Sequence, residues 1–261
     1  MNYENIKLDV AAGVATITLN RPNEANGITI PLAKDLLDAA QKCEVSNEVR
    51  AVILTGEGKM FCGGGDVNGF LEAGDNVSEM LIEITSFLHA AIARLRYMRA
   101  PVIVAVNGTA AGAGLSLAML GDYVIASEKA KFTMAYTGIG LSPDGSSSHF
   151  LPRVIGLRKT QELMLTNRLL TAQEALDWGM LNKVVPPEQL TSEAMSLAQQ
   201  IAKGPTDAYG KVKLLLNDTH MNDLEAQMDL ETRYISELGA SVDGKEGVSA
   251  FLEKRAPVFK G

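Results

Sequence analysis

The chain has 261 residues, of which 46% are hydrophobic and 21% charged, a composition typical of a globular protein with a full core. Its formal net charge of −7 argues against nucleic acid or an anionic membrane as the main partner. Only two cysteines occur, residues 1–10 lack the apolar core of a secretion signal, and no apolar run reaches membrane-spanning length. We therefore expect a cytoplasmic protein with no membrane or nucleic-acid partner.

The first part of the chain alternates predicted strands and helices. Apolar alternation over residues 6–10 and 14–19 predicts a β-hairpin, a helix follows Pro31, and residues 49–55 form the next strand. The segment KMFCGGGDVNGF (59–70) then offers bare backbone to a ligand at its three consecutive glycines. A mobile surface loop is expected over 71–78, followed by a helix over 79–99 that carries His89.

The centre of the chain carries the most informative pattern. APVIVAVNG (100–108) predicts a buried strand, and TAAGAGLSLAML (109–120) predicts a helix that follows a tight glycine turn. This arrangement points the free N–H groups of the first helical turn into a cleft. Such donors suit an oxygen atom that gains negative charge during a reaction.

The second half of the chain becomes progressively helical. Residues 122–126 predict a strand, and a segment rich in Gly, Ser and Pro follows it. Helices are predicted over 158–166, 171–178 and 191–203, with a strand over 180–185 and a capping box formed by Thr171 and Glu174. From Pro205 onward we expect helices alone, with a polar break near Ser241. The pattern predicts an α/β core over residues 1–200 and a helical region over 201–261.

Four motifs, in this order, resemble the crotonase (enoyl-CoA hydratase/isomerase) superfamily: FCGGGD (61–66), APVIVAVNGTAAGAGLSLA (100–118), GDYVIASEKAKF (121–132) and GVSAFLEKRAPVF (247–259). The resemblance implies an α/β spiral of ββα units that holds an acyl-CoA site, and a C-terminal helical region for trimerisation. It implies homotrimers, or hexamers built as dimers of trimers, and no cofactor, since coenzyme A is part of the substrate. It also implies that the N–H groups of Gly65 and Ala113 hold the thioester oxygen, although the family usually has glycine where Ala113 stands.

The side chains that move protons separate the activities of such a family. The two glutamates of the hydratases fall on Ser116 and Tyr136, and neither residue titrates usefully near neutral pH. Asp144, in GLSPDGSSSHFLP (140–152), stands where several family members that shift a double bond have an aspartate in a similar "PD" sequence. One carboxylate can carry a proton from the α-carbon to the γ-carbon. The sequence therefore predicts an enoyl-CoA isomerase with Asp144 as acid/base, in which Ser116→Ala leaves the rate nearly unchanged.

Substrate binding is assigned to six further positions: Gly63, Asp66, His89, Tyr136, Ala25 and Lys254, the last near the CoA phosphates across a subunit boundary. Two alternatives stay open. The 4-chlorobenzoyl-CoA dehalogenases of the superfamily have an aspartate nucleophile, a histidine that activates water and a tryptophan, which fall on Asp144, His89 and Tyr136. A non-catalytic acyl-CoA binder would also lack both glutamates. We expect no metal site, because no His/Cys cluster has ligand spacing.

Overall fold

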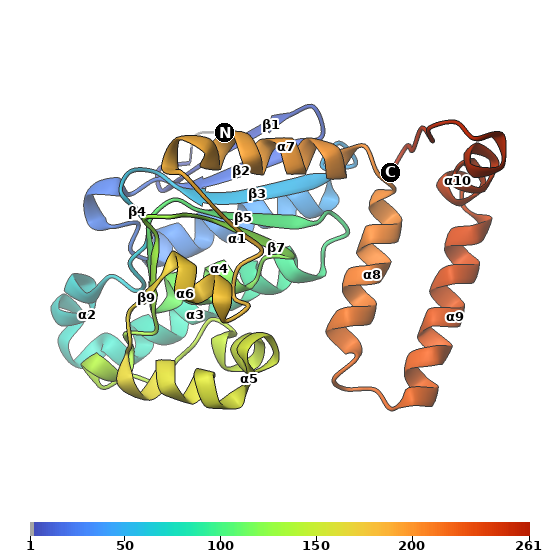
Figure 1. Cartoon of the computed structure of the whole chain (residues 1–261). Helices are drawn as coiled ribbons and strands as arrows, with labels where there is room; N and C mark the ends of the chain where they lie inside the picture. Colours follow the sequence, from blue (N-terminus) through green and yellow to red (C-terminus); the bar gives the residue numbers. More distant parts are fainter. Residues whose placement is uncertain (1–2) are drawn as a thin grey trace.

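The apolar runs of the sequence form a six-stranded sheet in the order β1-β2-β3-β5-β7-β10 (Figure 1). Its strands are β1 (Ile6–Ala11), β2 (Val14–Leu19), β3 (Ala51–Gly56), β5 (Val102–Val106), β7 (Tyr123–Ser127) and β10 (Lys183–Val185). β1 and β2 form the predicted antiparallel hairpin, and the other neighbouring strands pair in parallel. The computed structural model describes residues 3–261, so Met1 and Asn2, which belong to the segment searched for a secretion signal, lie outside the described residues.

Both faces of this sheet are buried, which explains why β5, at its centre, is apolar at every position. In β5, Val102, Val104 and Val106 pack into one apolar cluster, whereas Ile103 and Ala105 pack into another. The helices that cover the sheet are α1 (Ile30–Val45) and α3 (Val77–Tyr97) on the first side and α7 (Leu190–Ala202) on the second (Figure 1).

A second, smaller sheet gathers the segments that the sequence analysis singled out. Its strands, in order, are β4 (Met60–Cys62), β6 (Thr109–Ala111), β8 (Lys131–Thr133) and β9 (Leu170–Thr171). β6 runs parallel to both β4 and β8. Because the carboxyl ends of parallel strands meet at one edge, residues 63–65, 112–113 and 134–136 all leave the sheet from the same side.

The strand β6 corrects the prediction of one helix over residues 109–120. Thr109 and Ala110 pair with β4, and Ala110 and Ala111 pair with β8, so these residues are held in extended backbone. The helix α4 (Ala113–Met119) begins only after Gly112, whose φ of 52° turns the chain. A three-residue strand is too short to show a period of two, which is why the sequence pattern missed it.

The predicted mobile loop over residues 71–78 is also wrong. These residues continue α2 (Val67–Ala73), pass through a 3-10 turn (Gly74–Asn76) and begin α3. The Asp66 carboxylate caps α2 by accepting a hydrogen bond from the Gly69 N–H at 3.4 Å. The polar composition of this segment therefore reflects exposed helix rather than a lack of structure.

The remaining core helices follow the sequence prediction more closely. α5 (Ser147–Thr166) begins earlier than predicted and is kinked at Gly156, whose φ is 78°. α6 (Ala172–Asp177) opens with the capping box predicted for Thr171 and Glu174, which is confirmed. Three further 3-10 turns cover Pro22–Glu24, Thr137–Ile139 and Pro187–Gln189.

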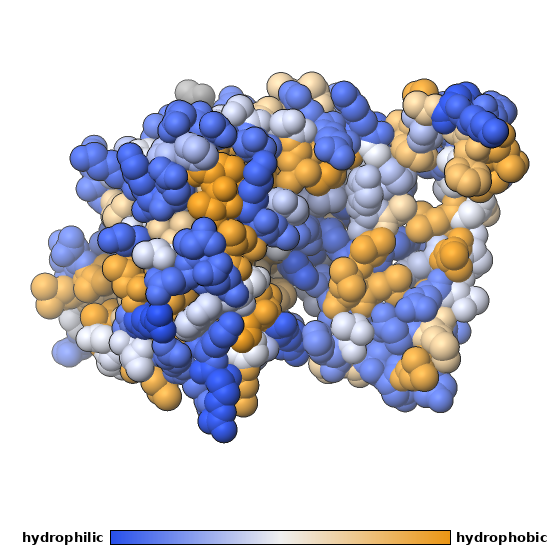
Figure 2. Space-filling view, viewed as in Figure 1, coloured by the Kyte–Doolittle hydropathy of each residue, from blue (hydrophilic) through white to orange (hydrophobic). Residues whose placement is uncertain are grey.

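The C-terminal part consists of helices alone, as predicted, and these are α8 (Thr206–Asp218), α9 (Leu224–Ala240) and α10 (Val242–Glu253). Ser241 caps α10 by accepting from the Gly244 N–H, so the expected polar break is limited to this one residue. Figure 1 shows α9 and α10 apart from the core, beyond α8, and no residue of α9 is buried. Figure 2 shows apolar residues over the helical arm formed by α8, α9 and α10. The large apolar residues exposed on these three helices are Val212, Leu216, Leu224, Met228, Ile235, Val242, Val248, Phe251 and Leu252.

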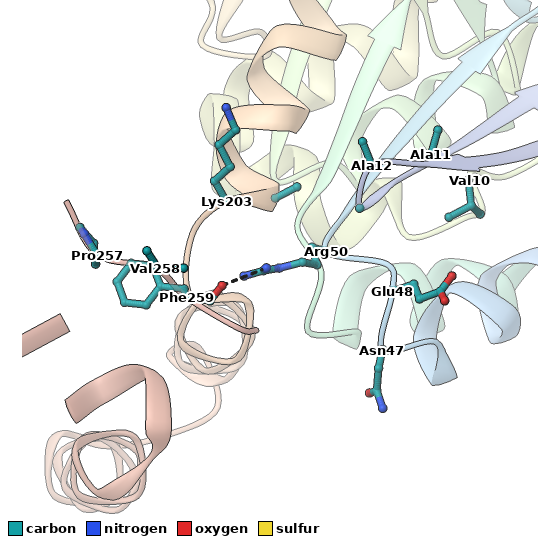
Figure 3. Close-up of a pocket in the computed structure, with 12 residues that line it drawn as sticks. Val10, Ala11, Ala12, Asn47, Glu48, Arg50, Lys203, Pro257, Val258 and Phe259 are labelled. Atoms are coloured by element: carbon teal, nitrogen blue, oxygen red, sulfur yellow. Dashed lines mark hydrogen bonds between the residues drawn. The ribbon is translucent and has the colours of Figure 1, made fainter. Parts of the chain in front are cut away.

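The end of the chain returns to the core at Arg50 (Figure 3). The Arg50 guanidinium donates hydrogen bonds to the Phe259 carbonyl at 3.2 Å, to the Gly204 carbonyl at 2.7 Å and to the Thr206 hydroxyl at 3.2 Å. These contacts fix both ends of the helical arm to the sheet. Within residues 3–261, no helix has the length and apolar character that crossing a membrane would require. The thiols of Cys43 and Cys62 are both buried and free.

Candidate active site

Two glycine-rich turns pack against each other at the edge of the small sheet. Gly64 has a φ of 100°, and a Cβ atom there would lie 3.0 Å from the Ala111 carbonyl oxygen and 3.5 Å from the Ala113 nitrogen. A Cβ atom at Gly114 would lie 2.1 Å from the Cys62 carbonyl oxygen. Side chains at these glycines would therefore push apart the turns that follow β4 and β6.

The backbone N–H groups of Gly65 and Ala113 are available to a ligand. Neither N–H donates a hydrogen bond to an acceptor within residues 3–261. Ala113 is the first residue of α4, where a helix leaves its N–H groups without partners. Both residues line the same cavity. The structure thus brings together the two residues that the sequence analysis names as oxyanion donors.

This cavity has a volume of about 310 Å³ and an apolar wall. Its apolar side chains come from Ile28, Val67, Phe70, Leu81, Ile84, Leu88, Ala113, Ala135, Ile139 and Leu141. Among the described residues, its only titratable side chains are Tyr136 and Asp144. The cavity therefore suits an apolar acyl group beside one carboxylate.

Asp144 is held by neutral hydrogen-bond donors from two directions. The Tyr136 hydroxyl donates to Oδ1 of the Asp144 carboxylate, and the hydroxyls of Ser116 and Ser147 donate to its backbone carbonyl at 2.8 Å and 3.0 Å. Burial, and then the negative charge of Asp144, raise the pKa of Tyr136 above its ordinary value. Tyr136 therefore stays protonated and acts as a donor rather than as a base.

The contact of Ser116 with Asp144 was not predicted from the sequence, in which Ser116 only marks the position of an absent glutamate. The Ser116 side chain is fully buried, and its hydroxyl lies 3.4 Å from the Tyr136 hydroxyl as well as against the Asp144 carbonyl. Asp144 follows Ser116 by 28 positions, and nothing in the local sequence pattern signals this contact.

His89 lies beside Asp144 but does not line the apolar cavity. Its Nε2 atom is 3.8 Å from Oδ2 of Asp144, which is too long for a hydrogen bond. The Gly145 N–H instead donates to His89 Nε2 at 3.2 Å. The His89 side chain lines a second cavity of about 350 Å³ together with Arg96 and His149.

The other predicted site residues lie in different places. Gly63 lines the apolar cavity and also borders an adjacent surface groove, which Ala25 and Asp66 line as well. Asp66 is paired with Arg21 at 3.2 Å. Lys254 is exposed at the end of α10, so a single chain does not bring it to the cavity. The buried Cys62 thiol has its pKa raised to about 12 by desolvation, so it stays protonated and packs as an apolar group.

The fold and the match to a family model together identify a crotonase-fold enzyme that processes acyl-CoA thioesters. The chain belongs to the enoyl-CoA hydratase/isomerase family, whose model matches residues 9–261.

Known relatives support this membership over nearly the whole chain. The chain is 40% identical to a 1,2-epoxyphenylacetyl-CoA isomerase of Escherichia coli K12, over 99% of each protein. It is 32% identical to a 4-chlorobenzoyl coenzyme A dehalogenase of Arthrobacter sp, over 88% of this chain and 84% of the relative. A solved structure of a putative enoyl-CoA hydratase/isomerase from Mycobacterium abscessus has a TM-score of 0.92 and 36% identity, over 97% of this chain and 98% of that chain. These names differ in their reactions, so they define the family but not the reaction of this chain.

Proposed function

We propose that this protein shifts a carbon–carbon double bond in an enoyl-CoA thioester, with Asp144 as the acid/base group. The observation that carries the proposal is the environment of the Asp144 carboxylate. Oδ1 accepts from Tyr136, whereas Oδ2 has no donor within hydrogen-bond distance among the described residues. One oxygen is thus held in place while the other is available for a substrate proton, in a cavity that also presents the N–H groups of Gly65 and Ala113.

The reaction uses these groups in two proton transfers. The Asp144 carboxylate takes a proton from the α-carbon, and the electron pair of that C–H bond moves into the thioester to give an enolate. The N–H groups of Gly65 and Ala113 stabilise the negative oxygen; one such donor typically contributes about 3–4 kcal/mol to lowering the barrier. The Asp144 carboxylic acid then returns the proton at the γ-carbon, and the double bond becomes conjugated with the thioester.

Hydration needs groups that this cavity does not offer. Water addition uses a base for the water and an acid for the α-carbon, and the two hydratase positions hold Ser116 and Tyr136. Ser116 donates to the Asp144 backbone, and the raised pKa of Tyr136 keeps that side chain neutral. The substrate class that fits is an apolar acyl group on coenzyme A, with no cofactor required.

The test is incubation of the purified protein with 3-hexenoyl-CoA in deuterated water, followed by mass spectrometry and NMR of the product. We expect 2-hexenoyl-CoA, in which deuterium enters the α- or γ-carbon. Asp144→Asn should remove both isomerisation and exchange while acyl-CoA binding persists. A 3-hydroxy product would instead establish a hydratase, and bound but unchanged substrate would establish a binder. A parallel incubation with 1,2-epoxyphenylacetyl-CoA tests the substrate named for the 40% identical relative.

A second candidate is a dehalogenase-type hydrolase. It is favoured by the position of His89 beside Asp144, at 3.8 Å between Nε2 and Oδ2, because that chemistry needs a histidine near an aspartate nucleophile. Against it, Tyr136 occupies the place of the tryptophan and holds Oδ1 of Asp144. Release of chloride from 4-chlorobenzoyl-CoA, measured under single-turnover conditions, would establish this activity.

We also propose that the chain forms a trimer or a dimer of trimers in the cytoplasm. The apolar side chains exposed on α8, α9 and α10 support assembly with further copies of the chain, and the free thiols fit a reducing compartment. Sedimentation equilibrium should give three or six times the chain mass of 27.9 kDa. A monomer at micromolar concentration would contradict this assembly.

A further inference from the structure

His89 contacts the loop that carries Asp144 through the backbone of Gly145 rather than through the Asp144 carboxylate. The Gly145 N–H donates to His89 Nε2 at 3.2 Å, whereas Oδ2 of Asp144 lies 3.8 Å from the same nitrogen. A histidine nitrogen accepts a hydrogen bond only when it carries no proton. In this arrangement His89 is therefore neutral, with its proton on Nδ1.

The Gly145 peptide is tightly enclosed on its other side. Gly145 has a φ of 61°, and a Cβ atom there would lie 2.8 Å from the Ser116 Cβ. Ser116, on α4, also holds the Asp144 carbonyl at 2.8 Å. The peptide that follows Asp144 thus lies between α4, which presents Ser116, and α3, which presents His89.

From this geometry we infer that His89 is a positioning residue, which acts as a neutral acceptor for the Gly145 N–H and thereby sets the position of the Asp144 carboxylate. The inference rests on the proposed function, because it assigns His89 a role through Asp144. It differs from the role of a base that activates water, since the lone pair of Nε2 is already used by the Gly145 N–H.

We therefore expect kcat to fall at acidic pH, because a protonated His89 can no longer accept the hydrogen bond from Gly145. Protonation would place an N–H on Nε2 opposite the Gly145 N–H and would turn Nε2 toward Oδ2 of Asp144. The charged and titratable groups that face His89 are Asp144 in the loop, His149 on α5, and Arg96 and Tyr97 on α3. Arg96 donates to the Leu120 carbonyl at 3.3 Å and to Asp122 at 3.2 Å. The hydrogen bond from the Gly145 N–H to His89 is therefore the contact that protonation of His89 removes.

Two substitutions at His89 distinguish the role of a hydrogen-bond acceptor from the role of a base that transfers a proton. His89→Gln keeps an acceptor near the position of Nε2 but cannot be protonated, whereas His89→Leu keeps the volume and removes the acceptor. His149→Leu is the matched control, because its side chain lines the same cavity, whereas the Gly145 N–H donates to His89. The readouts are kcat and KM for 3-hexenoyl-CoA from pH 5 to 8, α-proton exchange in deuterated water, and the thermal unfolding midpoint.

We expect His89→Leu to lower kcat and exchange by about 10- to 100-fold with KM within about 3-fold, because a displaced catalytic group loses rate rather than binding. His89→Gln should keep at least a third of the wild-type kcat at pH 8, and its rate relative to wild type should rise as the pH falls to 5. His149→Leu should stay within about 2-fold of wild type throughout.

Two results would overturn the inference. Wild-type kcat in His89→Leu at every pH would show that the hydrogen bond does not position Asp144. Equal inactivity of His89→Gln and His89→Leu would show that His89 itself transfers a proton. If His89→Leu does not fold, the pH dependence of His89→Gln decides alone. Asp144→Asn, measured alongside, separates the two proposals: an active Asp144→Asn enzyme refutes the proposed function, whereas an active His89→Leu enzyme with inactive Asp144→Asn refutes only the role of His89.

Discussion

Asp122 and Asp144 are similarly buried, with side-chain exposures of 20% and 28%, yet their surroundings are opposite. Asp122 is paired with two cations, Arg96 at 3.2 Å and Lys213 at 2.8 Å, and also accepts a backbone N–H. Asp144 accepts from the neutral Tyr136 hydroxyl and keeps Oδ2 without a donor among the described residues. The partners of a carboxylate, rather than its burial, therefore distinguish one whose oxygens are both engaged from one that keeps an oxygen available to a ligand.

The difference has a physical basis. Both oxygens of Asp122 are engaged, so their lone pairs stabilise the junction of α3, α8 and β7 and have no capacity for a substrate. Asp144 is oriented through Oδ1 and its own backbone, which leaves Oδ2 available for the proton transfer proposed above. Substitutions at the two clusters should therefore affect different measurements.

The largest expected effect comes from Asp144→Asn. It should lower kcat by about 10³-fold or more, because general acid–base catalysis contributes 10²–10⁴-fold and no second carboxylate lines the described cavity. Its free energy of unfolding should change by less than about 1 kcal/mol. Asp122→Asn should show the reverse: a loss of about 3 kcal/mol in urea unfolding, with kcat retained while the protein is folded. If Asp122→Asn loses rate and Asp144→Asn loses stability, the comparison is wrong.

The next largest effect is expected from Lys213→Met, and it should change stability alone. The Lys213 ammonium is almost fully buried, donates to the carbonyls of Leu95 and Ala100 and pairs with Asp122. Removing it leaves these acceptors without a donor, so urea unfolding should show a loss of about 2–3 kcal/mol.

The matched control for that measurement lies on the same helix. Lys211 pairs with Glu237, whose side chain is 63% exposed, so Lys211→Met should lose less than about 1 kcal/mol. Equal losses in the two variants would contradict the structural role given to the Asp122 cluster.

The core elements and the candidate site also differ in how far the sequence predicts them. The strands of the six-stranded sheet were predictable because its central strands β3 and β5 are buried on both faces and are apolar at nearly every position. The capping box at Thr171 was predictable because its two partners lie three residues apart. The two glycine turns and Asp144 were singled out from motifs that resemble a family, and the structure places them in one cavity.

What the sequence missed depends on packing between distant segments. The strand β6 exists because β4 and β8 flank it, and three residues carry no readable period. The contacts of Asp144 with Ser116 and of Gly145 with His89 join residues 28 and 56 positions apart. No local propensity encodes such hydrogen bonds, so they become visible only when α3 and α4 are placed against the loop.

A moderate effect is expected from Tyr136→Phe. Without the hydroxyl, Oδ1 of Asp144 loses its donor, and kcat should fall by about 10-fold, the value of one well-oriented hydrogen bond. Because burial and the Asp144 charge raise the pKa of Tyr136 above 10, the hydroxyl stays protonated up to that pH. The ratio of wild-type to variant kcat should therefore be constant from pH 7 to pH 10. A ratio that approaches one above pH 9 would show that Tyr136 ionises there.

The smallest effect is expected from Ser116→Ala, because Ser116 and Ser147 donate to the same Asp144 carbonyl. Either hydroxyl alone can hold that carbonyl, so each single substitution should lower kcat by less than about 3-fold. The double variant Ser116→Ala/Ser147→Ala should lose about 10-fold, more than the product of the single losses, while the exposed Ser148→Ala should match wild type. Single losses that multiply to the double loss would show independent roles. A loss above 10-fold in Ser116→Ala alone would give its hydroxyl a part in catalysis that its contact with the Asp144 backbone does not explain.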